Sequence, residues 1–413
     1  MKRICAAGVS FIAFLLFPVL GFGDDSHYTN ILVGDRAGAL AGAYTALSDD
    51  PAGMYYNPAG IVYASENSLS LSVNGYTSTS KEYKGAIGGK DWSRKSSGIV
   101  PNFFGMLHTW GKIKMGLSYA IPDQITENQY DTLFNIPTGT PGLSVTKFMI
   151  NHKTEDKTYN FGPSFAVEVA SRLSVGVTLY VHYRYMDYIS NQMAWLSNDQ
   201  TNWFNQYMNM EEWGVRPILG LIWRQPSKFS VGFAVSRVFA LRSESRLQMT
   251  EKDANDKTTI FNPPNSSDTR DYPYKISLGA AYYLNPDLLI TADITYYTPT
   301  DYTLFGSKRS FEAVINGALG SEYRMTKDLA LRAGLYSNRS STPEIKGVKG
   351  ENGEKVDGYG GSLALCYVAG KTSISLGGSY SLGDGKANIT ADPAIIDMAY
   401  RNWTLFISST YFF

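Results

Sequence analysis

The sequence of 413 residues predicts an all-β protein, a transmembrane antiparallel β-barrel of about 14 strands. The first observation is period-two alternation, which is clearest in residues 173–185, where Leu, Val and Tyr alternate mainly with Ser, Gly, Thr, His and Arg. The second is that tight turns alternate with long polar intervals, as in barrels that cross a membrane. The third is an aromatic content of 14% at a mean hydropathy of −0.19, which fits a polar interior and an apolar exterior.

Residues 1–23 have the features of a secretory signal peptide. Lys2 and Arg3 give a positive start, residues 11–20 form a short apolar run, and small residues precede the expected cleavage site. A retained membrane anchor is the alternative, but the run is short and no stop-transfer pattern follows it. Cys366 is then the single cysteine of the mature chain, which excludes a disulfide framework and a cysteine-based metal site.

Residues 34–63 differ from the rest of the mature chain because they are rich in Gly and Ala. We expect a short helix over residues 37–47 with Asp35 as its cap, ended by the turn Asp49-Asp50-Pro51. Asn57-Pro58-Ala59-Gly60 forms a second turn signal. Two interpretations of this segment stay open. Either its small residues let a helix pack closely inside a confined space, or it is an ordinary loop before a β domain.

The alternation pattern of the remaining chain, from about residue 66 to residue 413, predicts a succession of strands. The strands are expected to be joined alternately by tight turns and by long polar loops, among them loops over about 122–156, 189–210 and 242–271. In the seventh strand the alternation leads to Arg237, where we expect a bulge or a turn towards the pore. The strands expected first lie near residues 68–77, 99–109, 113–121, 159–170, 173–188, 212–223 and 229–241, and the tight turns lie at 110–112, 171–172, 225–227, 285–287, 326–328 and 369–371.

Three groups of residues resemble the FadL/TodX family of outer-membrane proteins. The order Gly34-x-Arg36-Ala37, Gly42-Ala43, Ala46, Asp49-Asp50 and Asn57-Pro58-Ala59-Gly60 resembles the family's N-terminal hatch. Pro101-Asn102 and Gly116-x-Ser118 resemble its second and third strands, and Tyr411-Phe412-Phe413 is an ending shared by most outer-membrane barrels. The resemblance implies a hatch over residues 24–65, containing Asn57, Pro58, Ala59 and Gly60, inside a barrel over residues 66–413.

The same resemblance implies an outer-membrane channel for passive uptake of hydrophobic molecules, with long-chain fatty acids as the favoured substrate. It also implies a lateral exit at a kink in the third strand. Ile121-Pro122 stands here where the family has a Gly. Because Pro lacks the N–H that a ladder needs, Pro122 opens the strand pairing or, alternatively, merely ends the strand.

Other functions find less support in the sequence. Lys+Arg and Asp+Glu both number 37, so charge gives no reason to expect nucleic acid. The four histidines are scattered, and no catalytic residues, metal ligands or cofactor motif stand out, so we expect no enzyme, metal or cofactor. The alternatives that stay open are an aromatic-hydrocarbon channel of the same family, a water-filled porin, and a non-transport barrel acting in protein secretion or assembly.

Three cations are the candidate ligand-binding residues. Alternation places Arg184, Arg216 and Lys275 on the inner face, towards the outer ends of their strands, where a ligand carboxylate in an apolar lumen would need a cation. Alternatively, they form ordinary salt bridges within the wall, with inward Glu168, Asp293 or Glu312. The expected partners are hydrophobic small molecules, outer-membrane lipid and, through Phe413, the barrel-assembly machinery. We expect a monomer.

Overall fold

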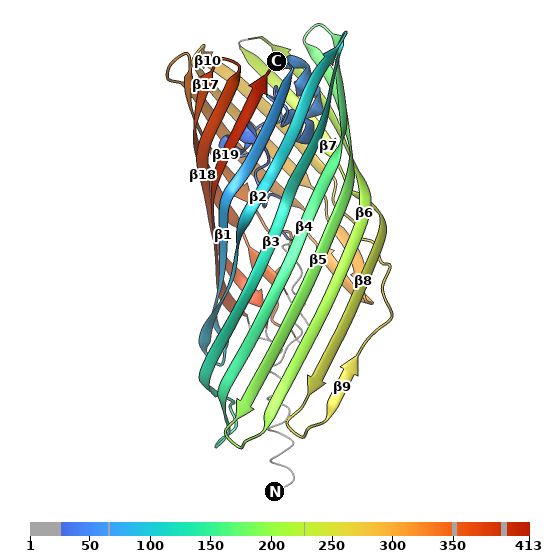
Figure 1. Cartoon of the computed structure of the whole chain (residues 1–413), viewed down its shortest axis with the longest axis vertical. Coiled ribbons are helices and arrows are strands. Elements are labelled where there is room, and N and C mark those ends of the chain that lie inside the picture. Colours follow the sequence, from blue (N-terminus) through green and yellow to red (C-terminus); the bar gives the residue numbers. More distant parts are fainter. Residues whose placement is uncertain (1–25, 65–66, 227, 349–352, 390–394) are drawn as a thin grey trace.

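The computed structural model describes residues 26–64, 67–226, 228–348, 353–389 and 395–413. Within these residues, fourteen antiparallel strands form a closed barrel, since the last strand pairs with the first (Figure 1). The predicted fold class is therefore confirmed. In order around the wall the strands are β1 (Ser68–Ile87), β2 (Lys90–Trp110), β3 (Ile113–Pro137), β4 (Ser144–Ala170), β5 (Leu173–Leu196), β6 (Thr201–Gln225), β7 (Phe229–Ser236), β10 (Lys275–Asn285), β11 (Leu288–Tyr297), β14 (Val314–Arg324), β15 (Leu329–Asn338), β17 (Gly358–Ala369), β18 (Thr372–Asn388) and β19 (Ile396–Phe412).

Five further strands are added to this wall or lie apart from it. β8 (Phe239–Lys252) continues the line of β7 along β6, and β9 (Thr258–Phe261) pairs with β8. β16 (Gly353–Val356) pairs with β18. β12 (Thr300–Leu304) and β13 (Ser307–Phe311) form a separate hairpin. The interruption between β7 and β8 falls at Arg237 and Val238, where the alternation predicted an irregularity.

The outer face is apolar, as the alternation predicted. On β5, Val177 and Leu179 are exposed while Ser174 and Thr178 are buried. An aromatic belt crosses the outer face, with ring-centroid distances of 6.2 Å from Tyr119 to Tyr159, 6.0 Å from Tyr159 to Tyr183 and 4.4 Å from Tyr183 to Trp213. Such belts lie at the level of the lipid headgroups. None of the described helices is long and apolar enough to cross a membrane.

Several strands run much further than the sequence predicted, so the expected polar loops were wrong. β3 continues to Pro137 and β4 begins at Ser144, where a loop was expected over about residues 122–156. β5 likewise reaches Leu196, and β6 begins at Thr201. Polar side chains made these stretches look like loops, but the antiparallel ladders simply continue, and an apolar cluster that includes Phe148 covers their inner face. These strands form an extended end of the barrel, opposite the end with the tight turns (Figure 1).

A luminal segment, residues 33–63, lies inside the barrel near the end with the tight turns (Figure 1). It contains the helices α2 (Asp35–Ala39) and α3 (Gly53–Tyr56) and the 3-10 helix η1 (Pro58–Tyr63). The helix expected over residues 37–47 was too long. α2 stops because Ala41 and Gly42 take positive φ angles of 56° and 81°, which end a right-handed helix. Asp35 lies in the first turn, and Gly34 is the N-cap.

Inward-facing glycines of the wall make room for this segment. A Cβ at Gly220 would lie 1.9 Å from Oδ1 of Asn57, and one at Gly176 would lie 2.4 Å from the carbonyl carbon of Pro58. A side chain at either position would therefore collide with the luminal segment. Because these glycines have no side chains, the backbones of β5 and β6 can lie directly against Asn57 and Pro58.

Candidate functional site

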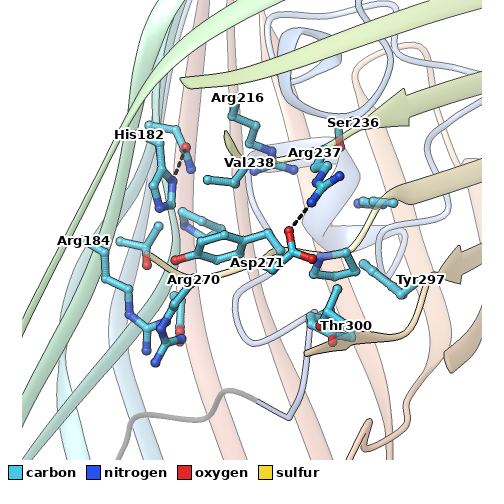
Figure 2. A pocket seen from close by; sticks show the side chains of 18 of the residues that line it. His182, Arg184, Arg216, Ser236, Arg237, Val238, Arg270, Asp271, Tyr297 and Thr300 are labelled. Carbon is cyan, nitrogen blue, oxygen red and sulfur yellow. Dashed lines mark hydrogen bonds and ion pairs between the residues drawn. The ribbon is translucent and has the colours of Figure 1, made fainter. Parts of the chain in front are cut away.

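A cavity of about 160 Å³ lies between the luminal segment and the extended end of the barrel (Figure 2). Its lining comes from β3, β4, β5, β6, β10 and β11, from the chain on either side of the β7–β8 interruption, and from the hairpin β12–β13. The three cations predicted as ligand-binding residues, Arg184, Arg216 and Lys275, all line this cavity. Period-two alternation predicted that their side chains point into the barrel, and the closure of the barrel brings them together.

Arg184 is neutralised by the wall. Its guanidinium donates to both carboxylate oxygens of Asp156 on β4, over 2.9 and 2.5 Å, and both side chains are buried. The wall salt bridge considered from the sequence therefore exists for Arg184, but with a partner that the sequence did not suggest. Glu168 instead accepts a hydrogen bond from the backbone N–H of Arg172 at a tight turn.

Arg216 and Lys275 have aromatic neighbours instead of acidic ones. The guanidinium of Arg216, which is 8% exposed, lies 4.6 Å from the ring centroid of Tyr55, and the ammonium of Lys275 lies 5.9 Å from the same centroid. Within the described residues, no carboxylate oxygen lies within 4.0 Å of either cation. Asp293 instead accepts hydrogen bonds from the backbone N–H groups of Tyr44 and Thr45 in the luminal segment. An anion in the cavity would therefore find two cations that no protein carboxylate contacts within 4.0 Å among the described residues.

The structure adds two arginines that the ligand prediction missed. Arg237 forms an ion pair with Asp271 and lies 4.7 Å from the ring centroid of Tyr274, while Arg270 lies 5.1 Å from that of Tyr302. Figure 2 shows Arg216 and Arg237 on one side of the cavity and Arg184 and Arg270 on the other. The broken alternation at Arg237 was the available signal for that residue. Arg270 lies in a loop that folds back into the barrel, so no periodicity marked it.

The hairpin β12–β13 borders the cavity on the side of the extended end. Tyr302 and Phe311 both line the cavity, and their rings stack at 5.7 Å. At the hairpin tip, Phe305 packs against a methionine-rich cluster on the inner faces of β5, β6 and β8, made up of Met186, Tyr188, Met208, Met210 and Leu247. A ligand that arrives from the extended end therefore meets the hairpin before it meets Arg216.

The wall beside the cavity is not fully hydrogen-bonded. Between β2 and β3, the continuous ladder ends at Phe103 with Ala120, and beyond it the structure has the single pair of Ser96 with Glu127. Ile121 and Pro122, the predicted kink, lie in this gap, and Pro122 also lines the cavity. Because β3 continues to Pro137, the alternative that Pro122 ends the strand was wrong.

The chain that leads into the luminal segment lies along this gap. Ile31 donates its backbone N–H to the carbonyl of Pro122 over 3.2 Å, and the side chain of Asn30 donates to Asp123 over 3.2 Å. On the other strand, the amide of Asn102 donates to the carbonyl of Leu32 over 3.0 Å. Residues 30–32 thus supply polar contacts that β2 and β3 do not give each other here.

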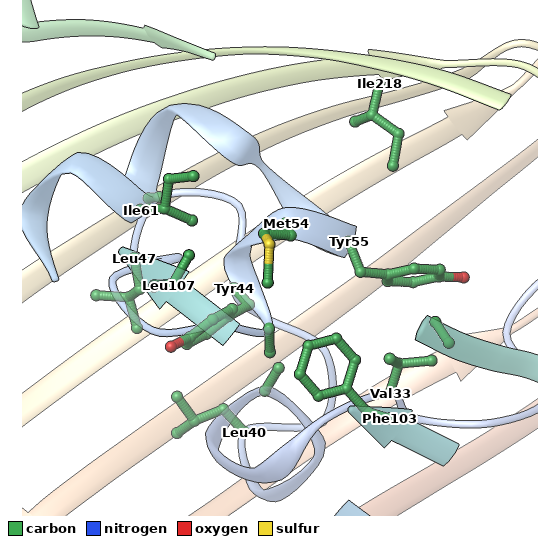
Figure 3. Packing of buried hydrophobic residues seen from close by; sticks show 14 of the residues in the cluster. Val33, Leu40, Tyr44, Leu47, Met54, Tyr55, Ile61, Phe103, Leu107 and Ile218 are labelled. Atoms are coloured by element: carbon green, nitrogen blue, oxygen red, sulfur yellow. The ribbon is translucent and has the colours of Figure 1, made fainter. Parts of the chain in front are cut away.

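The luminal segment forms the floor of the cavity and is packed like a protein core. Figure 3 shows Leu40, Tyr44, Met54 and Ile61 gathered with Phe103 and Leu107 of β2. Asn57 is fully buried, and its side-chain amide donates to the carbonyls of Thr45 (2.8 Å) and Leu221 (3.2 Å) while its Oδ1 accepts the N–H of Ala59 (3.2 Å). The predicted hatch residues Asn57, Pro58, Ala59 and Gly60 all lie in this packed region.

Wall hydroxyls also hold the segment. Four side chains from three strands, β5, β7 and β17, donate hydrogen bonds of 2.7–2.8 Å to its backbone carbonyls. The donors are Ser174, Thr178, Ser230 and Ser362, and the acceptors are Ala59, Met54, Ala46 and Ala39 in that order. Backbone groups without a regular ladder are thereby satisfied inside the barrel.

An ion-pair cluster joins the same segment to the wall. Arg36 donates to Asp49 over 2.7 Å and to both oxygens of Glu322 on β14 over 2.7 and 2.9 Å. Glu322 also accepts a hydrogen bond from Arg332 of β15 over 2.7 Å, and Arg224 of β6 lies 3.3 Å from Asp49. These groups are mostly buried, so the negative charges of Asp49 and Glu322 are compensated in part by Arg36.

We predict that Arg36→Ala loosens the luminal segment. Removal of one partner from a buried ion pair costs on the order of 3 kcal/mol, because the other charges stay buried without it. Single-channel recording should show frequent openings in Arg36→Ala that the unmodified protein lacks. Arg339→Ala, which removes a half-exposed ion pair with Asp357, is the control and should stay closed. If Arg36→Ala is equally closed, the cluster does not hold the segment in place.

A sequence profile of the family described as "Outer membrane protein transport protein (OMPP1/FadL/TodX)" matches residues 30–347, which is more than half of the chain. The chain belongs to the FadL/TodX family. As a member of this family, the protein is an outer-membrane transport protein for hydrophobic compounds, and the family is one of channels. Its tight turns then face the periplasm and its extended end faces outwards, as in other outer-membrane barrels.

Solved structures of the FadL/TodX family share this fold. A FadL homologue from Pseudomonas aeruginosa is 14% identical, with a TM-score of 0.67 over 94% of this chain and 100% of its own. The Pseudomonas putida toluene transporter TodX is 11% identical, with a TM-score of 0.63 over 93% and 99%. The monoaromatic hydrocarbon channel CymD is 12% identical, with a TM-score of 0.60 over 92% and 97%. Among curated proteins, no sequence matches this chain.

Proposed function

We propose that this protein is a passive uptake channel for hydrophobic molecules that carry a carboxylate, with long-chain fatty acids as the class favoured by the sequence. The observation that carries the proposal is the position of Arg216 and Lys275, two cations without a carboxylate partner among the described residues, in a cavity that reaches Pro122. A carboxylate would form charge-assisted hydrogen bonds with such groups. Uptake then follows the concentration gradient and consumption inside the cell.

We further propose that the ligand leaves sideways through the gap between β2 and β3. The luminal segment fills the barrel below the cavity, so it obstructs a straight route to the periplasm. The unpaired stretch at Ile121 and Pro122 lies beside the cavity and needs no wall ladder to break. On this proposal, residues 34–63 act as the hatch, and residues 30–32 move before a ligand passes.

An aromatic-hydrocarbon channel is the second candidate. The cavity is lined by aromatic rings, among them Tyr28, Tyr55, Tyr297, Tyr302 and Phe311, and such a lining suits a neutral ring as well. The structural relatives include a toluene transporter and a monoaromatic hydrocarbon channel. Uptake of labelled oleate and of labelled toluene by cells with and without the gene separates the two candidates. Uptake of neither would contradict the transport proposal.

We predict that Arg216→Ala weakens carboxylate binding by about 1.5–3 kcal/mol, the scale of a hydrogen bond to a charged group. Arg184→Ala should lower this affinity less, because Arg184 is neutralised by Asp156. The measurement is calorimetric titration of the purified protein with a fatty acid and with its methyl ester. An equal loss of affinity for acid and ester in Arg216→Ala would contradict the carboxylate role.

Phe413 ends the chain at the periplasmic side, exposed and with its backbone N–H bonded to the carbonyl of Asn67. We propose that the barrel-assembly machinery recognises this residue. We also propose that the protein acts as a monomer, since the barrel closes on itself and leaves no open wall edge.

A further inference from the structure

The outer face of the extended end continues the face that carries the aromatic belt. Along β5, buried residues from Tyr180 to Leu196 alternate without interruption with residues that are partly or fully exposed. β5 and β6 stay in register along their whole shared length (Figure 1). Side chains above the belt therefore point away from the barrel. From Tyr183 to Trp195 the strand rises roughly 40 Å, which a tilt of about 40° turns into roughly 30 Å above the lipid headgroups.

A charged band lies directly above the belt on this face. Its side chains occupy outward positions in neighbouring rows of the register across β4, β5, β6 and β8. They are Glu155, Lys157, Asp187, Glu211, Glu244 and Arg246. Lys157 pairs with Glu155 over 2.6 Å, and Arg246 pairs with Glu244 over 2.7 Å. The band offers cations to phosphate groups, and it offers carboxylates to a divalent cation that bridges to phosphate.

An amide row follows further from the membrane. Asn151, Asn191 and Asn205 stand side by side on β4, β5 and β6, because the register pairs Asn191 with both of the others. The amide of Asn205 donates to that of Asn191, and among the described residues no hydrogen bond occupies the side chain of Asn151. A side-chain amide carries two N–H donors and an acceptor oxygen. The row therefore presents free donors and acceptors to a ligand that is rich in hydroxyl groups.

Aromatic rings border the amide row. On β6, Trp203 and Tyr207 lie two positions on either side of Asn205, so all three side chains point outwards. Tyr130 on β3 is paired with Asn151 and is 75% exposed. Such rings have an apolar face and a polar edge. A sugar ring matches this surface, because its C–H groups stack on an aromatic face while its hydroxyls bind amides. The amides also interrupt the apolar surface that an acyl chain would need.

The order of the bands indicates one occupant. Going outwards, the face is aromatic at the headgroups, then charged, then neutral with amides and rings. The lipopolysaccharide of an outer leaflet changes in the same order, from acyl chains through acidic, phosphate-bearing inner sugars to neutral outer sugars. We propose that the outer face of β3, β4, β5 and β6 around the amide row binds the neutral outer sugars of this glycolipid. The charged band then meets the inner sugars, and the extended end carries a fixed shell of lipopolysaccharide.

The test is calorimetric titration of the purified full-length protein in detergent with two lipid-free oligosaccharides released from lipopolysaccharide. One has the complete core, and the other has only the phosphorylated inner sugars, which should bind much more weakly. Asn191→Ala and Trp203→Ala should each lower the affinity for the complete core about two- to tenfold, the effect of losing one hydrogen bond or one ring contact. Trp203→Phe keeps a ring and should retain most of the affinity.

The matched control is Asn255→Ala, which changes an exposed asparagine in the loop between β8 and β9, outside this face, and should bind normally. Heat-modifiable migration on gels checks that each variant is folded. Equal affinity for the two oligosaccharides, or no binding of either, would overturn the proposal. Unchanged affinity in both Asn191→Ala and Trp203→Ala would do the same. Self-association in sedimentation experiments that is lost in Trp203→Ala, without oligosaccharide binding, would assign the face to a second copy of the chain instead.

Discussion

Deletion of residues 34–60 should leave a barrel that still inserts into the membrane but conducts ions freely. The fourteen wall strands, with their apolar outer faces, lie outside the deleted range. Inside, the deletion removes the packed core around Tyr44 and Met54 and frees wall hydroxyls such as Ser174 and Thr178 to bind water. Without the luminal segment, a barrel of this size would hold a continuous column of water.

The measurement is single-channel conductance of the deletion variant and of the intact protein in planar bilayers. A milder variant keeps the whole chain: Gly220→Val places a side chain where Oδ1 of Asn57 now lies, so it should displace the segment and raise conductance. Gly75→Ala is the control, because a Cβ there meets only an ordinary contact at 3.8 Å. Equal, low conductance of the deletion variant and the intact protein would show that the segment does not block the barrel.

Closing the gap between β2 and β3 should stop most uptake without affecting folding. Pro122→Val restores one backbone N–H, which can donate to the carbonyl of Pro101, its partner in the register of the flanking pairs, so a ligand would need to break this hydrogen bond to leave sideways. The side chain of Gln124 on β3 already reaches β2 here, since a Cβ at Gly98 would lie 3.6 Å from its Nε2.

The uptake rate of a labelled ligand by intact cells measures this effect. A reversible version uses the double variant Ile99→Cys and Gln124→Cys, whose positions face each other in the register of the flanking pairs. Uptake should fall on oxidation and recover when a membrane-permeable reductant is added, while each single cysteine variant should be unaffected. Uptake that persists through the closed gap would contradict the lateral route and favour a route past the luminal segment.

The sequence alone predicted much of this protein because a strand has a period of exactly two residues in the direction of its side chains. Alternation identified the barrel and its outer face, and it placed Arg184, Arg216 and Lys275 inside. Turn residues located the short connections, and Asn57-Pro58-Ala59-Gly60 indicated the family. Each of these properties is local, since it depends on neighbours within a few residues of the chain.

What the tertiary structure decided depends on partners far apart in the sequence. Arg184 is neutralised by Asp156, and Arg216 is left without a carboxylate partner, because of strand register and not because of any local pattern. The lengths of β3 and β4 depend on a ladder and an inner apolar cluster that no single stretch reveals. The cavity itself exists only because the luminal segment and the hairpin β12–β13 fold into the barrel from distant parts of the chain, and such packing is set by the whole fold.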